Sequence, residues 1–244
     1  MGKGYKGVPC VYCIEREAST ADHVIAREFF PKDKRGDLPK VPACSACNND
    51  KSTLEHALTA IMPFGARHAD SGQAIAMTER RLAKNRKLHA KLAARLAYSM
   101  RSTNGGPWRL EMTVPVDHAD IERLCEFIVR GLAFHHWKVA LGPELFVRAS
   151  FLNEAGRQHF DPFFAGAARA KVQHDFGDGV FVYKGVQAEE CLELTLWKMS
   201  IYGAEFGGDQ RQPGERCSMV YGISVPKTWR AAEMLMQILG HAAY

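Results

Sequence analysis

The residues best able to do chemistry lie near the N-terminus, where two cysteine pairs flank an Asp-His dipeptide. Cys10 and Cys13 are separated by two residues, and Cys44 and Cys47 repeat that spacing after an interval of thirty residues. A two-residue spacer lets one tight turn direct both thiolates at a single ion, and two such pairs match a tetrahedral four-cysteine zinc site. Four thiolates leave no open coordination position, so we expect this zinc to be structural rather than catalytic.

Other polar side chains stand close to these cysteines. The dipeptide Asp22-His23 lies between the pairs, Asn48 directly follows the second pair, and Lys51 comes three residues later. The pattern CxxC…DHxI…PACxxCNxxK, within residues 8–55, resembles the HNH nuclease family. The core of that family, called ββα-metal, has two short strands and a helix around one catalytic divalent ion.

The resemblance implies a role for each of these side chains. His23 falls on the general base, Asp22 and Asn48 fall on the ligands of a catalytic metal ion, and Lys51 falls on a phosphate contact. Phosphodiester hydrolysis needs a base to deprotonate water and positive charge on the scissile phosphate. An imidazole with an ordinary pKa near 6.5 suits the first task, and oxygen ligands suit Mg²⁺ or Mn²⁺ for the second.

Two positions leave alternatives open. Asn49 is an alternative to Asn48 as the second ligand. Members of the family usually carry an asparagine that orients the base five residues before the third cysteine, and here that residue is Pro39. Asp37 or a backbone carbonyl would then have to orient His23.

Charge is distributed unevenly along the chain, which has a net charge of +5. Residues 1–106 carry 18 Lys and Arg against 10 Asp and Glu, whereas residues 107–244 are mildly acidic. A basic half of this kind favours contact with a polyanion, although solvated helix faces also carry such charge. A predicted helix over about 71–98 could bind DNA phosphates through Arg80, Arg81, Lys84, Lys87 and Lys91.

The predicted fold class is α+β, with an N-terminal zinc-stapled ββα-metal module, a basic helical segment and a C-terminal mixed α+β domain. We place the boundaries at 1–55, 56–106 and 107–244, because Asn104-Gly105-Gly106-Pro107 is typical of a linker. Ser52 is the candidate cap of a helix over 52–62. Beyond 107 the patterns predict a helix over 119–141, strands at 108–116, 144–152, 179–186, 191–199 and 217–225, and a final helix over 229–239.

These features predict a metal-dependent DNA endonuclease, which would act on double-stranded DNA in restriction or anti-phage defence. A single HNH module cuts one strand, so a double-strand break requires a homodimer or two nicks. Residues 107–244 would recognise the target, sense an activating ligand or partner protein, or dimerise. The alternatives are a zinc-knuckle protein that binds nucleic acid without cutting it, and a nuclease that acts on RNA.

The distribution of apolar residues along the chain indicates the cellular compartment. No apolar run approaches the roughly 18 residues needed to span a bilayer, and the basic N-terminus lacks the apolar stretch of a secretory signal. We therefore expect a cytoplasmic protein without a membrane partner, in which the cysteines are reduced or metal-bound.

Overall fold

The computed structural model describes residues 5, 7–65, 71–84, 86–94, 97–102, 106–113, 117–203, 206–207, 216–217, 219–229 and 232. Helices and strands are both present and largely separate along the chain, so the α+β class is confirmed. No helix in these ranges is long and apolar enough to cross a membrane. The predicted final helix over 229–239 lies almost entirely outside the described residues.

The N-terminal part forms a small hairpin followed by a helix. Strands β1 (Thr20–His23) and β2 (Lys40–Ala43) pair antiparallel, with Asp22 opposite Val41 and His23 opposite Lys40. Two short 3₁₀ helices, η1 (Arg27–Phe29) and η2 (Lys32–Lys34), lie in the connection between them.

Helix α1 (Ser45–Ile61) follows β2 directly, and it begins earlier than predicted. Its N-cap is Cys44, whose sulfur accepts a hydrogen bond from the Cys47 backbone N–H at 3.5 Å. Ser52 is therefore an interior residue, and its prediction as a cap is wrong. The helix also runs through residue 55, where the sequence predicted the end of the module.

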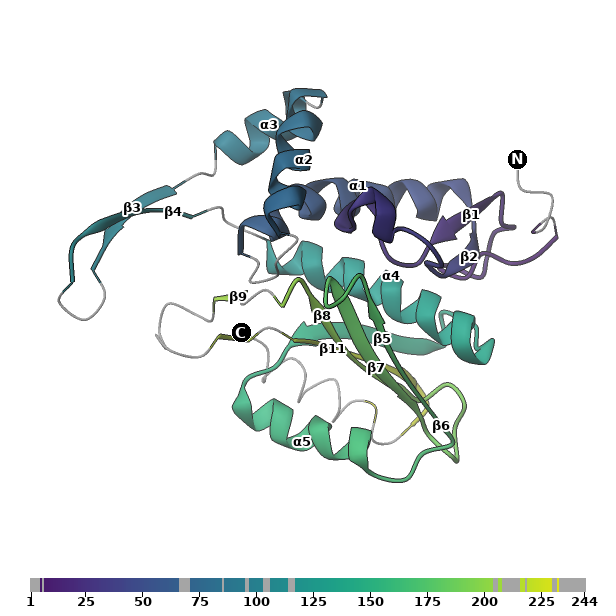
Figure 1. Cartoon of the computed structure of the whole chain (residues 1–244). Helices are drawn as coiled ribbons and strands as arrows, with labels where there is room; N and C mark the ends of the chain where they lie inside the picture. The colour runs from purple at the N-terminus through teal and green to yellow at the C-terminus, as the bar shows by residue number, and fades with distance from the viewer. Residues whose placement is uncertain are drawn as a thin grey trace.

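The C-terminal part is built on a five-stranded antiparallel sheet in the order β5-β11-β8-β7-β6. Its strands are β5 (Leu145–Phe151), β6 (Ala170–Phe176), β7 (Phe181–Gln187), β8 (Thr195–Ile201) and β11 (Val220–Pro226). Helix α4 (His118–Trp137) packs on one face and α5 (Glu154–Ala165) on the other (Figure 1). A short pair, β9 (Phe206–Gly207) and β10 (Arg216–Cys217), stands apart from this sheet.

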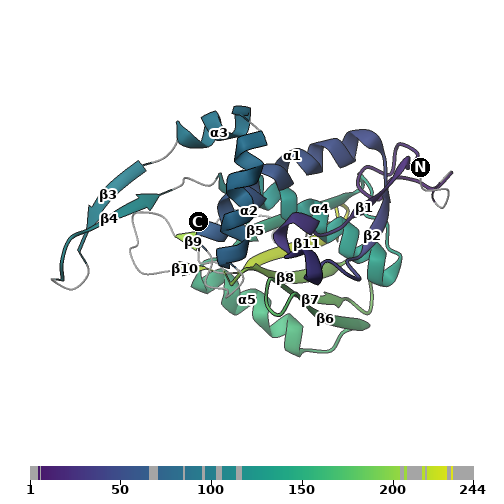
Figure 2. The same ribbon diagram turned by 45° about the horizontal axis from the view of Figure 1, so that its top comes forward.

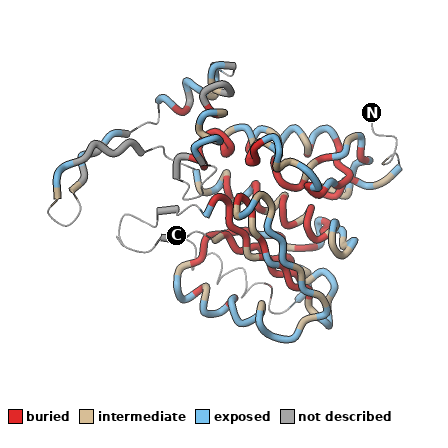
Figure 3. The backbone as a smooth tube through the Cα atoms, viewed as in Figure 1, coloured by how far each residue is buried: buried red, intermediate tan, exposed pale blue. Residues whose placement is uncertain are grey.

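One hydrophobic core joins the N-terminal part to the sheet, because α4 lies between α1 and the sheet (Figure 1). Tyr12 meets Phe127 of α4 edge-to-face, with ring centroids 5.1 Å apart. Gly131 of α4 packs so closely on Val24 that a Cβ atom there would lie 2.7 Å from a Val24 methyl carbon. Figure 3 shows the resulting continuous band of buried backbone.

The middle of the chain differs most from its prediction. The single helix expected over 71–98 is two helices, η3 (Met62–Gly65) precedes them, and a hairpin follows. The helices are α2 (Ser71–Lys84) and α3 (Arg86–Ala93), and the hairpin strands are β3 (Ala97–Arg101) and β4 (Arg109–Thr113). The predicted linker at 104–107 therefore falls in the loop of a hairpin, although residues 104 and 105 lie outside the described part. Figure 2 shows this hairpin projecting from the body of the molecule.

Candidate metal centre and active site

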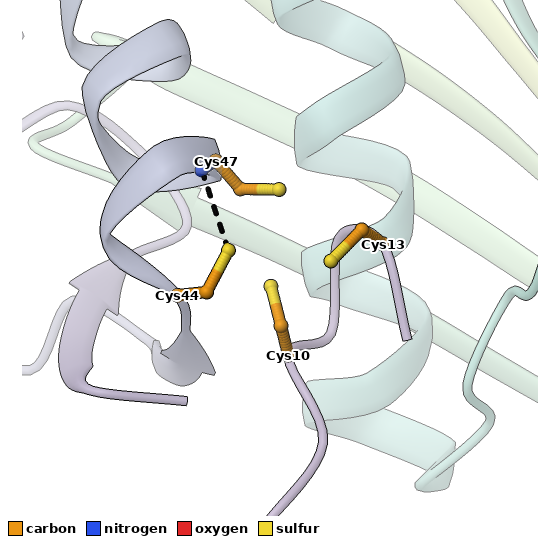
Figure 4. A group of neighbouring side chains, drawn as sticks. All are labelled: Cys10, Cys13, Cys44 and Cys47. Carbon is orange, nitrogen blue, oxygen red and sulfur yellow. Dashed lines mark hydrogen bonds between the residues drawn. The ribbon is translucent and has the colours of Figure 1, made fainter. Parts of the chain in front are cut away.

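The four predicted cysteine ligands come together. The Sγ atoms of Cys10, Cys13, Cys44 and Cys47 all lie within 4.8 Å of one another, and all four cysteines are free. Figure 4 shows the side chains of the first pair, from a loop, facing those of the second pair at the start of α1. A tetrahedral ion with Zn–S bonds of about 2.3 Å would separate the sulfurs by about 3.8 Å. The thiols thus lie close enough to bind one metal ion, and a four-sulfur donor set suits zinc.

Backbone hydrogen bonds form the turn that holds the first pair. The Cys10 N–H donates to the Arg16 carbonyl oxygen, and the Ile14 N–H donates to the Cys10 carbonyl oxygen, both at 2.8 Å. Ile14 has a φ of 63°, which is unfavourable for a β-branched residue. This turn is therefore a constrained one, and a bound ion would stabilise it.

Burial disfavours the ionised form of these thiols, so a bound cation would be needed to hold them as thiolates. Burial raises the pKa of Cys10 and of Cys47. Burial acts in the same direction on Cys13, but hydrogen bonds from Arg16 outweigh it and lower the pKa of Cys13 to about 7. Crowded thiols of this kind ionise together only when a positive ion shares them.

Lys51 occupies a different place from the one its sequence position predicted. Its side chain is fully buried, and its Nζ donates to the His23 carbonyl oxygen at 2.7 Å. The same atom pairs with Asp22 Oδ2 at 3.0 Å and with Glu55 Oε1. A buried ammonium with three acceptors cannot reach a phosphate, so the prediction of a phosphate contact is wrong. Lys51 instead ties α1 to the end of β1.

Two further residues complete this buried polar network, and the sequence analysis missed both. The Tyr12 hydroxyl donates to Asp22 Oδ2 at 2.6 Å, and burial together with the Asp22 charge raises the pKa of Tyr12. Glu55 lies one helical turn after Lys51, and burial raises its pKa to about 7 although the lysine acts in the opposite direction. Asp22 Oδ1 makes no hydrogen bond within the described residues, which leaves it free for another ligand.

His23, the predicted base, is the last residue of β1 and is half-buried. Burial lowers its pKa, and the positive charges of Lys40 and Arg27 lower it further. The imidazole is therefore neutral at pH 7. Lys40 and Arg27 are both exposed, and Lys40 stands opposite His23 in the β1–β2 pair.

No side chain orients this imidazole within the described residues. The Pro39 carbonyl oxygen, near the predicted position of the orienting group, instead accepts a hydrogen bond from the Val24 N–H at 2.8 Å. Asp37, the other candidate, is exposed and makes no hydrogen bond to His23. Neither of the predicted orienting groups contacts the imidazole ring.

The two candidate asparagines lie on different faces of α1. Asn48 is half-buried and stands one turn before Lys51, so it shares the face that meets β1. Asn49 is exposed, and its carbonyl oxygen accepts a hydrogen bond from Thr53. The geometry thus favours Asn48 over Asn49 as a partner for Asp22.

Asp22 and His23 leave the backbone in opposite directions, because successive side chains of a strand alternate. Asp22 points to α1, where its partner Lys51 lies. A phosphate that contacts both side chains would therefore have to lie at the C-terminal end of β1, where it could reach both faces of the strand. The half-exposed His23 and the exposed Lys40 and Arg27 leave that end accessible.

The predicted basic residues are distributed over two helices. Arg80, Arg81 and Lys84 belong to α2, and Lys87 and Lys91 belong to α3. Lys87 is exposed, while the side chains of the other four lie outside the described residues.

Comparison with known proteins adds no assignment: no family model, no curated protein and no solved structure matches this chain. Within the described residues, the four cysteines are the only group of three or more Cys, His, Asp and Glu side chains arranged to hold a metal ion.

Proposed function

We propose that this protein is a metal-dependent endonuclease that hydrolyses DNA phosphodiester bonds and that residues 8–55 are an HNH-type ββα-metal module. The observation that carries the proposal is the buried contact of Lys51 with Asp22 and with the His23 carbonyl. This contact joins the end of β1 to the first turns of α1, where Asn48 lies. Asp22, His23 and Asn48 thus belong to adjoining parts of the module, with the side chains of Asp22 and His23 on opposite faces of β1.

His23 acts as the base in this proposal. Its lowered pKa keeps the ring neutral at pH 7, so a ring nitrogen can accept a proton from water. The exposed Lys40 and Arg27 bind phosphate oxygens beside it. A positioned base of this kind contributes roughly 10²–10⁴ to the rate.

Asp22 and Asn48 would hold a divalent cation through oxygen atoms, which suits Mg²⁺ or Mn²⁺. The ion would supply positive charge to the scissile phosphate and the leaving oxygen. Because Oδ2 of Asp22 is already bonded to Tyr12 and Lys51, its free Oδ1 is the ligand atom.

The four thiolates would hold a structural zinc ion. Binding of this kind contributes an apparent 10–16 kcal/mol, as an order of magnitude, to the folding of a small zinc module. Because Asn48 directly follows Cys47 and helix α1 is capped by Cys44, the zinc ion would also fix the position of the first turn of α1, which carries Asn48.

Supercoiled plasmid tests the proposal. The wild-type protein should convert it to nicked circles with Mg²⁺ or Mn²⁺ and not with EDTA. His23→Ala should slow this by at least about 100-fold. The matched control is His159→Ala, which changes an exposed histidine of α5 and should leave the rate unchanged. Equal rates for wild type and His23→Ala would refute the role of His23.

A second candidate function is nucleic-acid binding without cleavage. It is favoured by the absence, within the described residues, of a hydrogen bond that orients His23. Under this alternative, DNA is retained in a gel-shift assay but plasmid is not nicked under any metal condition. Running both assays on a structured RNA separates the third possibility, an RNA substrate.

A further inference from the structure

Residues 71–113 comprise α2, α3 and the β3–β4 hairpin; α2 and α3 pack next to α1, and the hairpin projects from the rest of the molecule (Figures 1 and 2). We call this segment the arm. Among the residues that the structure describes, the two strands of its hairpin pair with each other and with no further strand. A two-stranded hairpin alone is marginally stable in water. A binding partner would therefore stabilise the hairpin.

The hairpin exposes large apolar side chains. Tyr98 is 62% exposed, Met100 is 56% exposed and Trp108, beside the hairpin loop, is 68% exposed. These three make up half of the large exposed hydrophobic residues in the described part of the chain. Figure 3 shows no buried segment along the described part of this hairpin, in contrast to the buried strands of the main sheet. The concentration of large exposed apolar side chains indicates that the hairpin is a contact surface.

The arm is also the most basic part of the molecule. Residues 71–113 contain nine Lys and Arg against two Asp and Glu, a net charge of +7 in a chain whose total is +5. Arg86 and Lys87 of α3 are exposed. At the loop end of the hairpin, the backbone register places Arg101 opposite Arg109.

The positive charge of the arm and its exposed apolar side chains together indicate which kind of partner binds it. A second copy of this chain would bring +7 against +7 if the arms met, so arm-to-arm association is disfavoured. A polyanion instead neutralises the positive charge of the arm. Among polyanions, duplex DNA has a major groove about 12 Å wide that admits a two-stranded β-ribbon, and it has base steps into which apolar side chains can insert.

We propose that the arm is a duplex-DNA-binding element in which α2 and α3 contact phosphates and the hairpin enters a groove, with Trp108 stacked against the bases. The proposal deepens the nuclease assignment and takes DNA as the substrate from it. The arm would hold the duplex, and the edge formed by His23, Asp22 and Asn48 would cut it.

Fluorescence anisotropy of a labelled 30-base-pair duplex in EDTA tests the arm without cleavage. Trp108→Ala should weaken binding by about 5- to 150-fold if its stacking matches the 1–3 kcal/mol that one base–aromatic stack contributes in single-stranded complexes. It should leave the salt dependence unchanged, because no phosphate contact is lost. Trp108→Phe, which keeps a ring, should bind better than Trp108→Ala. The control is Trp229→Ala, an exposed tryptophan outside the arm, which should bind like wild type.

The phosphate contacts have a separate signature. Lys87→Gln should weaken binding and reduce the slope of log affinity against log salt by about 0.9, the contribution of one released counterion. Lys184→Gln, an exposed lysine of β7, should leave the slope unchanged. Binding of Trp108→Ala within twofold of wild type would overturn the proposal, and so would tighter binding to a matched RNA duplex.

The two proposals fail differently. If His23-dependent nicking occurs but Trp108→Ala binds and nicks like wild type, the nuclease assignment stands and the arm proposal is wrong. If Trp108→Ala loses duplex binding but no variant or wild type nicks plasmid, the arm proposal stands and the nuclease assignment is wrong.

Discussion

Replacement of Lys51 by methionine tests the buried network most severely. The lysine is fully buried and its ammonium contacts three oxygen atoms, one each from Asp22, His23 and Glu55. Methionine has a similar length and fills the same volume without a charge. The substitution therefore removes the interaction and leaves the packing nearly intact.

The expected loss is large because two carboxylates are left without their cation. Removing one partner of a buried ion pair typically costs about 3–5 kcal/mol. We expect the free energy of unfolding at pH 8 to fall by about that amount. Lys40→Met makes the same chemical change at an exposed position of β2, and it should cost less than about 0.5 kcal/mol.

The loss should also depend on pH. Burial raises the folded-state pKa of Glu55 to about 7, above its ordinary 4.5, so its contribution to stability decreases as pH rises from about 4.5 to about 7. Lys51 restrains that rise, so in Lys51→Met the Glu55 pKa rises further and the decrease continues above pH 7. Each unit of additional shift corresponds to about 1.4 kcal/mol. The loss caused by Lys51→Met should therefore be larger at pH 8 than at pH 5.5.

Urea unfolding followed by circular dichroism at pH 5.5 and pH 8 measures both effects. Glu55→Gln in the Lys51→Met background should restore part of the stability at pH 8, since it removes one uncompensated carboxylate. A loss below about 1 kcal/mol at pH 8 would refute the argument that Lys51 is a buried anchor. So would a loss that is the same at both pH values.

Three further substitutions and one change of condition test the rest of the structure. Cys44→Ser should abolish zinc binding, measured as metal content, and unfold residues 1–52, seen by circular dichroism; full folding without metal would contradict this. Gly131→Ala should destabilise by about 1–3 kcal/mol through overpacking, because its Cβ would press on a side chain of the N-terminal module. Gly72→Ala, which meets nothing within 4 Å, should be neutral or stabilising by up to about 1 kcal/mol. The cleavage rate should fall on the acid side with a midpoint below the ordinary 6.5, because burial and nearby cations lower the pKa of His23; a flat rate down to pH 5 would contradict that role.

Local sequence patterns predicted the strands that are largely buried. Strands β5, β7, β8 and β11 are close to their predicted ranges, and α4 begins at His118, one residue before the predicted start at 119. Strand β6 was missed because it is an edge strand with mostly exposed residues, so its sequence, AKVQHDF, carries no clear apolar face. Helix α5 was missed as well, and it contains Pro162, which interrupts the usual helix pattern.

The sequence predicted the cysteine cluster of the candidate site but not the contacts of Lys51. The cysteine cluster follows from local spacing, because each pair occupies one turn. The role of Lys51 does not, because its partners Asp22 and His23 are 28 or more residues away and lysine is rarely buried. The only local signal was Glu55, four residues after Lys51, which is the spacing of a helical ion pair. Tyr12 lay between two cysteines and gave no signal of its contact with Asp22.

Chemical rescue of His23→Gly tests the central claim most directly, since it asks whether an imidazole at the end of β1 promotes phosphodiester hydrolysis. Nicking of supercoiled plasmid with Mg²⁺ or Mn²⁺ should be nearly lost in His23→Gly and should return in proportion to added imidazole, while His159→Gly should gain nothing from imidazole. Wild-type nicking that persists in His23→Gly without imidazole would contradict the claim, as would a wild-type protein that nicks no plasmid with either metal.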